Sequence, residues 1–120
     1  NDQFAKLLRL KQRYQQIDIA LGLHPYFLKW QDEAQTQVML NEFSQLASVH
    51  QNQYIAFGEM GLDGSLERDM AYQEKILRFQ LKLASVYNKP VILHHRKSHN
   101  HLIRLLKEQK YQGGGILHAF

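Results

Sequence analysis

Four short apolar runs alternate with longer segments of helical periodicity, and this alternation constrains the fold more than any other feature. The runs cover residues 17–24, 54–59, 90–96 and 115–118. Short apolar runs of this kind are typical of strands that are buried on both faces of a sheet. Because helical segments separate the runs, the sequence predicts an α/β fold in which parallel strands are joined by right-handed crossovers.

The segments between the runs carry apolar residues at spacings of three and four, which is the pattern of a helix with one buried face. They predict helices over residues 3–16, about 39–50, 67–87 and 98–110. Ser98 is the expected N-cap of the last helix. No linker, repeat or low-complexity segment interrupts this order, so we expect one domain over residues 1–120.

The composition limits the chemistry that the chain can support. None of the 120 residues is cysteine, so any metal must be bound by imidazole and carboxylate groups. No apolar run approaches the roughly 20 residues of a membrane span, and no secretory signal begins the sequence. We therefore expect a soluble, cytoplasmic protein without a membrane partner. The formal net charge of +4 would assist the binding of a polyanion, although an ordinary basic surface is the simpler explanation.

Each apolar run ends in or near a polar side chain that could carry chemistry. The carboxyl ends of parallel strands lie at one edge of a sheet or barrel, where active sites form, so we expect these side chains to converge. They are His24, Glu59, His94 and His118. Strand alternation places Glu59 on the same face as Ile55. Imidazole and carboxylate groups suit divalent ions, and a water bound to such an ion becomes a hydroxide nucleophile near neutral pH.

These residues also have structural interpretations. A buried histidine at a strand end is more often hydrogen-bonded within the fold than bound to a metal, and Glu59 could cap the glycine-rich segment around it. Asp63 could contact a substrate or accept hydrogen bonds from loop amides. Arg96 could bind a phosphate or form a buried ion pair with Asp63. Alternation directs His95 toward the helix layer, which favours a structural role. The histidines that we expect to face solvent are His50, His99 and His101.

Five segments of the chain resemble, in order, the successive signatures of the TatD family of metal-dependent hydrolases. They are Gly22-Leu23-His24-Pro25, Gly58-Glu59-Met60-Gly61-Leu62-Asp63, Gln80-Leu81-Lys82-Leu83-Ala84, Pro90-Val91-Ile92-Leu93-His94-His95-Arg96 and Leu117-His118-Ala119-Phe120. Lys97-Ser98-His99 is similar to the YjjV-like branch of that family. The likeness covers nearly the whole chain from Ile19 onward.

The resemblance implies a TIM-type (β/α)₈ barrel of the amidohydrolase superfamily that binds two divalent metal ions. It also implies hydrolysis of phosphodiesters, typically of DNA, by a metal-activated water. By motif position, Glu59 corresponds to the carboxylate ligand of the metal centre and to a catalytic residue, while His94 and His118 correspond to ligands of the second metal. The remaining motif positions lie near the substrate pocket and are occupied by His24, Asp63 and Arg96.

Two departures from the family pattern limit what the resemblance implies. A His-x-His or His-x-Asp pair on the first strand and a metal-binding aspartate on a later strand are not among these 120 residues. Ala119 stands where relatives usually have Cys or Gly, a change that we expect to be harmless. The chain corresponds to about strands two to five of eight, so we expect a central fragment of a longer enzyme, with exposed terminal strands.

The expected activity of this segment is correspondingly limited. With about half of the ligand set, the 120-residue segment alone should bind metal weakly and show little or no hydrolysis. Two alternatives to a TatD-type nuclease remain open at this point. One is a hydrolase of the same superfamily that acts on an amide or ester, because a metal site does not choose the bond that is cleaved. The other is a non-catalytic scaffold or nucleic-acid-binding fragment.

Overall fold

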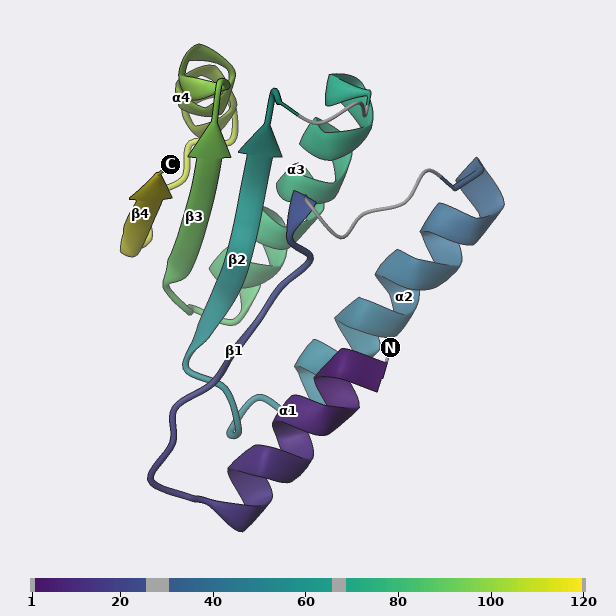
Figure 1. Ribbon diagram of the computed structural model, residues 1–120, viewed down its shortest axis with the longest axis vertical. Coiled ribbons are helices and arrows are strands. Elements are labelled where there is room, and N and C mark those ends of the chain that lie inside the picture. The colour runs from purple at the N-terminus through teal and green to yellow at the C-terminus, as the bar shows by residue number, and fades with distance from the viewer. Residues whose placement is uncertain (1, 26–30, 66–68, 120) are drawn as a thin grey trace.

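The strands of the described chain form one parallel sheet with the order β1-β2-β3-β4 (Figure 1). The computed structural model describes residues 2–25, 31–65 and 69–119, with side chains from residue 4 to residue 117. The strands span Ala20–Leu21 (β1), Ala56–Asp63 (β2), Val91–Arg96 (β3) and Gly115–Ala119 (β4). Every neighbouring pair is parallel, which confirms the predicted arrangement.

Helices precede or connect the strands in the predicted order. They span Asp2–Arg13 (α1), Glu33–Val49 (α2), Met70–Val86 (α3) and His99–Glu108 (α4). α2 begins earlier than apolar spacing alone predicted, because the side chain of Asp32 accepts a hydrogen bond from the backbone of Gln35 and completes a capping box. Ser98 occupies the predicted N-cap position of α4, although its side chain makes no capping hydrogen bond there.

β1 is much shorter than the predicted strand over residues 17–24. Gly22 lies so close to β2 that an added Cβ would be 2.6 Å from the carbonyl carbon of Gly58. The N–H and C=O groups of Leu23 are hydrogen-bonded to the side chain of Gln80 on α3 instead of to a neighbouring strand. The backbone after Leu21 is therefore anchored to a helix, and the strand ends there.

β2 is longer than predicted, because the glycine-rich segment after Phe57 belongs to the strand and is not a loop. Gly61 has a φ of 153°, and a Cβ at this position would lie 1.8 Å from the carbonyl oxygen of His94. Only glycine permits this approach, since any side chain would push the two strands apart. The glycines thus bring the carboxyl ends of β2 and β3 close together.

The apolar core lies between the sheet and the helices that pack on it. Its largest fully buried apolar side chains are Leu21, Phe43, Tyr54, Phe57, Met60, Leu62, Ile76, Leu77, Leu81 and Leu105. The last strand is exposed, as predicted for a terminal strand, with Ile116 and Leu117 66% and 54% accessible. No helix in the described part of the chain has the length and apolar character needed to cross a bilayer.

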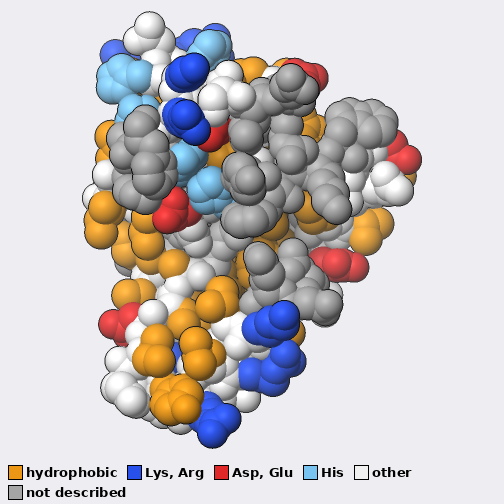
Figure 2. All heavy atoms as spheres, viewed as in Figure 1, with side chains coloured by type: hydrophobic (Ala, Val, Ile, Leu, Met, Phe, Trp, Pro, Cys, Tyr) orange, Lys and Arg blue, Asp and Glu red, His pale blue; other side chains and the backbone are white. Residues whose placement is uncertain are grey.

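Histidine side chains gather at the carboxyl end of the sheet. The strands run upward in Figure 1, so the carboxyl ends of β2 and β3 lie at the upper end of the molecule. In the same view, the visible histidine side chains lie in the upper half of the molecule, whereas Lys and Arg side chains lie at both ends (Figure 2). The carboxyl end of the sheet is the edge at which the sequence predicted the functional residues.

Candidate metal centre

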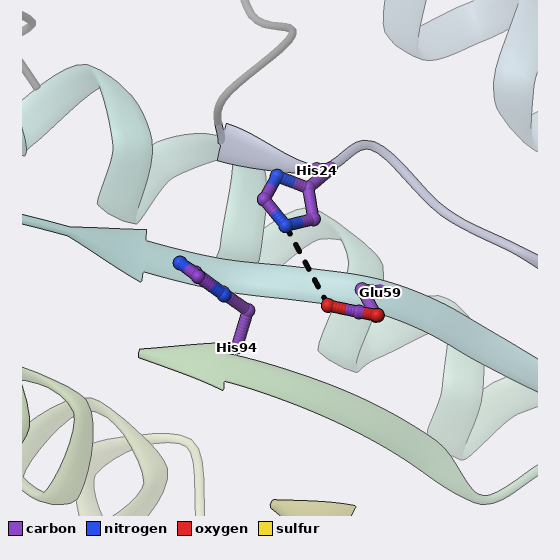
Figure 3. A group of neighbouring side chains, drawn as sticks. All are labelled: His24, Glu59 and His94. Atoms are coloured by element: carbon purple, nitrogen blue, oxygen red, sulfur yellow. Dashed lines mark ion pairs between the residues drawn. The ribbon is translucent and has the colours of Figure 1, made fainter. Parts of the chain in front are cut away.

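His24, Glu59 and His94 converge at the carboxyl edge of the sheet (Figure 3). His24 follows β1, Glu59 lies within β2 and His94 lies within β3. One potential ligand atom from each residue lies within 4.8 Å of those of the other two. His24 Nε2 is 3.5 Å from Glu59 Oε1, and the rings of His24 and His94 are 4.5 Å apart between centroids.

This group fits a divalent metal ion by both donor type and spacing. Two ligand atoms bound at about 2.1 Å to a tetrahedral ion lie roughly 3.4 Å apart, close to the 3.5 Å between His24 and Glu59. The side chains of His24 and Glu59 are 22% and 35% exposed, whereas that of His94 is 4% exposed. The group is therefore anchored inside the fold and open to solvent on one side, as a catalytic metal site requires.

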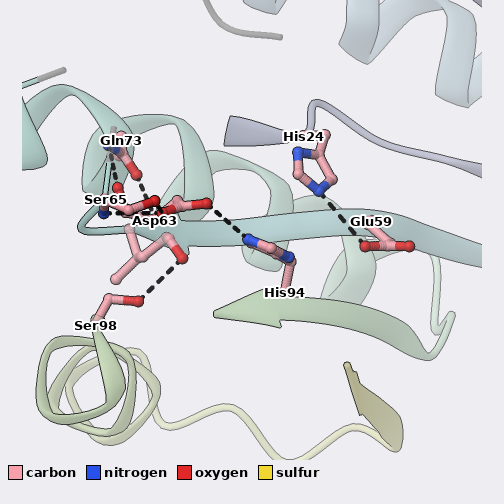
Figure 4. A network of polar contacts seen from close by, with 8 residues as sticks. His24, Glu59, Asp63, Ser65, Gln73, His94 and Ser98 are labelled. Atoms are coloured by element: carbon pink, nitrogen blue, oxygen red, sulfur yellow. Dashed lines mark hydrogen bonds and ion pairs between the residues drawn. The ribbon is translucent and has the colours of Figure 1, made fainter. Parts of the chain in front are cut away.

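A buried carboxylate orients His94 (Figure 4). Asp63 Oδ2 lies 3.1 Å from His94 Nε2, and both side chains are at most 5% exposed. The carboxylate of Asp63 also accepts hydrogen bonds from the backbone N–H and the hydroxyl of Ser65. Burial alone would raise the pKa of Asp63, but the hydrogen bonds from Ser65 and His94 outweigh it and hold that pKa below its ordinary value. An ionised carboxylate behind an imidazole fixes the ring and its tautomer, as partners of metal-binding histidines do.

Two buried glutamines of α3 fix the backbone beside the site. Gln80 Oε1 accepts the N–H of Leu23 at 2.7 Å, and its Nε2 donates to the C=O of Leu23 at 3.3 Å. Gln73 binds both backbone groups of Asp63 in the same way, at 2.8 and 3.1 Å. Both glutamines are 0% exposed, and their spacing of two helical turns places them on one face of α3. One helix therefore holds the residue before His24 and the residue that contacts His94.

Sequence analysis did not identify these two glutamines as part of the site. Gln80 entered only as a member of a family segment, and Gln73 did not enter at all. A signal was nevertheless present, because two amides seven residues apart interrupt the apolar face of α3. Amides on a buried face need hydrogen-bond partners, and backbone groups at strand ends are suitable ones.

Two other predicted site residues are His118 on β4 and Arg96 at the end of β3. The Cα of His118 pairs with that of His94 across β3 and β4, but its side chain lies outside the described residues, so its role as a ligand stays a prediction. Arg96 is exposed at the end of β3, and the alternative of a buried ion pair with Asp63 is wrong, because that carboxylate is bonded to Ser65 and His94. A phosphate-binding role for Arg96 stays a prediction.

The predicted positions of Glu59, Asp63 and His95 have mixed outcomes. Alternation from Ile55 does not fix the direction of Glu59, because Ile55 precedes β2 and the register shifts between Gly58 and Met60. Substrate binding by Asp63 stays a prediction, although its burial and its contact with His94 favour an orienting role. His95 lies on the α4 side, as predicted, with its ring 5.4 Å from that of His99.

Comparison with known proteins places the chain in a family. Residues 1–120 match the profile described as TatD related DNase. The chain belongs to this family. It is 37% identical over 121 residues to the uncharacterized metal-dependent hydrolase YjjV of Escherichia coli strain K12, covering 99% of this chain and 45% of that protein. It is 31% identical to the human deoxyribonuclease TATDN3, covering 98% of this chain and 46% of the relative.

Solved structures of TatD-family proteins share the fold. The crystal structure of YjjV from Escherichia coli K12 aligns with a TM-score of 0.83 over 99% of this chain and 45% of that one. A TatD-family hydrolase from Entamoeba histolytica, 28% identical, aligns with a TM-score of 0.80 over 96% of this chain and 40% of that one. The chain thus spans slightly less than half the length of these relatives. Four parallel β/α units over this share agree with the predicted part of a TIM-type barrel.

Proposed function

We propose that the protein containing this chain is a metal-dependent phosphodiesterase that cleaves nucleic acid, with DNA as the first substrate to test. The observation that carries the proposal is the convergence of His24, Glu59 and His94 within 4.8 Å at the carboxyl edge of the sheet. The names of relatives support the substrate class. The family is described as TatD related DNase, and similar proteins include a human deoxyribonuclease and the 3'-5' ssDNA/RNA exonuclease TatD of Citrobacter koseri.

In this proposal, Glu59 and His94 bind the metal ion, and Arg96 binds the substrate. A divalent ion at this centre would supply a water of lowered pKa and would polarise a phosphoryl oxygen. Glu59 provides the carboxylate ligand from the partly exposed side of the group, and His94 is held in place by Asp63. Arg96 presents an exposed guanidinium at the end of the same strand, where its planar fork suits a phosphate.

The proposal includes two divalent ions in the complete site, of which this chain supplies part of the ligand set. His118 pairs in register with His94 on the neighbouring strand, which supports a role for His118 as a further ligand beside His94; which of the two ions each histidine binds stays a prediction. Imidazole donors favour Zn²⁺, whereas carboxylate donors suit Mn²⁺ and Mg²⁺, so this mixed donor set is compatible with all three ions. We also propose that the protein acts in the cytoplasm, where nucleic acid is available as a substrate.

Metal analysis and turnover of two substrates test the proposal. The intact protein should bind a divalent metal and hydrolyse bis(p-nitrophenyl) phosphate and single-stranded DNA. Glu59→Gln removes the ligand charge and should reduce both activities more than about 100-fold. Glu42→Gln is the matched control, because Glu42 is an exposed carboxylate on α2. Turnover that survives Glu59→Gln would contradict the proposal. So would a preference for amide or ester substrates, or a protein that binds no metal.

A further inference from the structure

A groove of about 420 Å³ lies beside the start of α4, on the other side of the β3 end from the candidate metal centre. We call it the α4 groove. Its lining residues are His95, Lys97, Ser98, His99, Asn100 and His101. The histidine and basic side chains at the upper end of Figure 2 lie where Figure 1 places α4 and the end of β3.

The lining of the α4 groove includes one lysine and the imidazole rings of three histidines. None of its lining residues is Asp or Glu, and the first turn of α4 carries no acidic residue. Lys97, His99 and His101 are exposed, and His95 is half-buried with its ring near that of His99. The hydroxyl of Ser98 already donates to the backbone oxygen of Leu62, so its hydrogen is not available to a phosphate in the groove.

This combination matches the chemistry of a nucleic acid strand. A Lys ammonium and imidazole or amide N–H groups donate to phosphate oxygens. Imidazole rings also offer faces on which unpaired bases stack, a recurrent feature of single-strand recognition. The ammonium group of Lys97 also gives the groove a charge that is complementary to a polyanion.

The position of the groove indicates which nucleic acid it would bind, namely the substrate of the metal centre. His94 of the candidate centre and His95 of the α4 groove are consecutive residues of β3, so their Cα atoms are about 3.8 Å apart and their side chains lie on opposite sides of the strand. The metal centre and the α4 groove therefore lie on the two sides of the end of β3, and the adjoining nucleotides of a nucleic acid strand bound at the metal centre are the part of the substrate nearest to the groove.

We propose that the α4 groove binds the sugar-phosphate backbone of the same single-stranded nucleic acid whose phosphodiester is cleaved at the metal centre. The groove raises the affinity for a polymer and takes no part in the chemical step. This inference rests on the proposed nuclease function, and it adds where the substrate strand is held.

Charge substitution in the groove tests the proposal in the intact protein. Lys97→Glu, alone and with His101→Ala, should raise KM for a single-stranded DNA oligonucleotide about tenfold or more and reduce the salt dependence of binding by about one charge. The turnover number, and hydrolysis of bis(p-nitrophenyl) phosphate, should stay within about twofold of the wild type. Lys6→Glu is the charge-matched control, because Lys6 is exposed on α1, away from this edge.

Each outcome separates the groove from the metal centre. If Lys97→Glu leaves both the oligonucleotide KM and the turnover of bis(p-nitrophenyl) phosphate unchanged, the proposal for the groove is wrong. The proposed nuclease function is not affected by that result. An equal effect of Lys6→Glu would also overturn the proposal for the groove, because net charge would then explain the result. If the wild type hydrolyses neither substrate, the nuclease proposal fails, and oligonucleotide binding measured by fluorescence anisotropy still decides whether Lys97→Glu weakens the groove. Preferential binding of an acidic peptide over the oligonucleotide would count against it.

Discussion

Two adjacent histidines at the end of β3 occupy opposite environments. His94 is 3% exposed and is bonded to the buried carboxylate of Asp63, whereas His95 is half-buried on the α4 side beside the exposed His99. Strand alternation alone separates them. The comparison teaches that the side of the strand, and not the residue type, assigns the role: a fixed imidazole suits a metal, and a surface imidazole suits a mobile ligand.

The largest expected effect comes from replacing His94 with alanine, compared with the same substitution at His95. His94→Ala should abolish stoichiometric metal binding and reduce turnover of bis(p-nitrophenyl) phosphate more than about 100-fold. His95→Ala should leave both within about twofold of the wild type. Metal analysis and steady-state kinetics on the two purified variants measure the difference.

A stability control is needed because His94 is buried with a charged partner. Its removal leaves Ser65 as the partner of the Asp63 carboxylate among the residues that the structure describes, and breaking such a buried pair costs about 3 to 5 kcal/mol. His94→Gln retains a nitrogen at the position of Nε2 that can donate to Asp63, yet lacks the imidazole. Loss of metal in this variant, with unfolding close to that of the wild type, would assign the effect to the missing ligand. If His95→Ala lost metal to the same extent, the conclusion that the two histidines have different roles would be wrong.

The next largest effect should follow from Asp63→Asn, which removes the charge that orients His94. Loss of such a carboxylate partner typically reduces metal affinity about 10- to 100-fold. Isothermal titration with Zn²⁺ or Mn²⁺ at neutral pH measures the change. An affinity equal to that of the wild type would show that the environment of His94 depends on burial alone.

The same substitution should alter the stability of the protein in acid. The folded-state pKa of Asp63 lies below its ordinary value of 3.8, so this group stabilises the fold above that pH. The contribution is lost as the pH falls through the folded-state pKa, because the proton binds first to the unfolded chain. Urea unfolding measured from about pH 6 to about pH 2 should show a steeper decline in unfolding free energy for the wild type than for Asp63→Asn. Parallel curves would contradict the assignment.

A smaller effect on the metal centre is expected from the glutamines of α3. Gln80→Leu leaves the buried N–H and C=O of Leu23 without their partner, which costs about 1 to 3 kcal/mol for each group that stays unsatisfied. Because Leu23 precedes His24, the loosened backbone should also weaken metal binding several-fold. Chemical unfolding and metal titration measure the two effects separately.

Tyr54→Phe provides the matched control for this substitution. The hydroxyl of Tyr54 donates to the backbone oxygen of Ala47 at 2.9 Å, and the side chain is 1% exposed. Its loss should cost about 1 kcal/mol, with no change in metal affinity, because Tyr54 precedes β2 at the amino end of the sheet. If both variants lower metal affinity in proportion to their stability, Gln80 supports the fold and does not position the site.

The fold could be predicted because strand and helix order depends on local periodicity. Every predicted strand and helix is present within the described residues, in the predicted order. The extent of β1 could not be predicted, because it depends on the contact between Leu23 and Gln80, which are 57 positions apart. The continuation of β2 through Gly58 and Gly61 was missed for a related reason. Glycine marks both loops and close backbone contacts, and only the neighbouring strand distinguishes them.

The candidate site could be predicted in outline and not in detail. Convergence of His24, Glu59 and His94 follows from parallel topology, which brings strand ends to one edge. The direction of Glu59 does not follow, because a register shift interrupts the alternation on which that prediction depended. The pairing of Asp63 with His94 depends on the register of β2 against β3, and a one-residue difference would direct the carboxylate elsewhere.

The smallest expected effect tests whether the two sides of the β3 end are mechanically separate. Ser98 Oγ donates to the backbone oxygen of Leu62 at 3.0 Å, so it connects the start of α4 to the residue before Asp63 (Figure 4). Ser98→Ala should cost about 1 kcal/mol of unfolding free energy, because one buried hydrogen bond is lost. Metal affinity should remain within about twofold, since Gln73 still holds both backbone groups of Asp63. A tenfold loss of metal affinity would show that α4 positions His94 through β2, and the two histidines would then belong to one coupled unit.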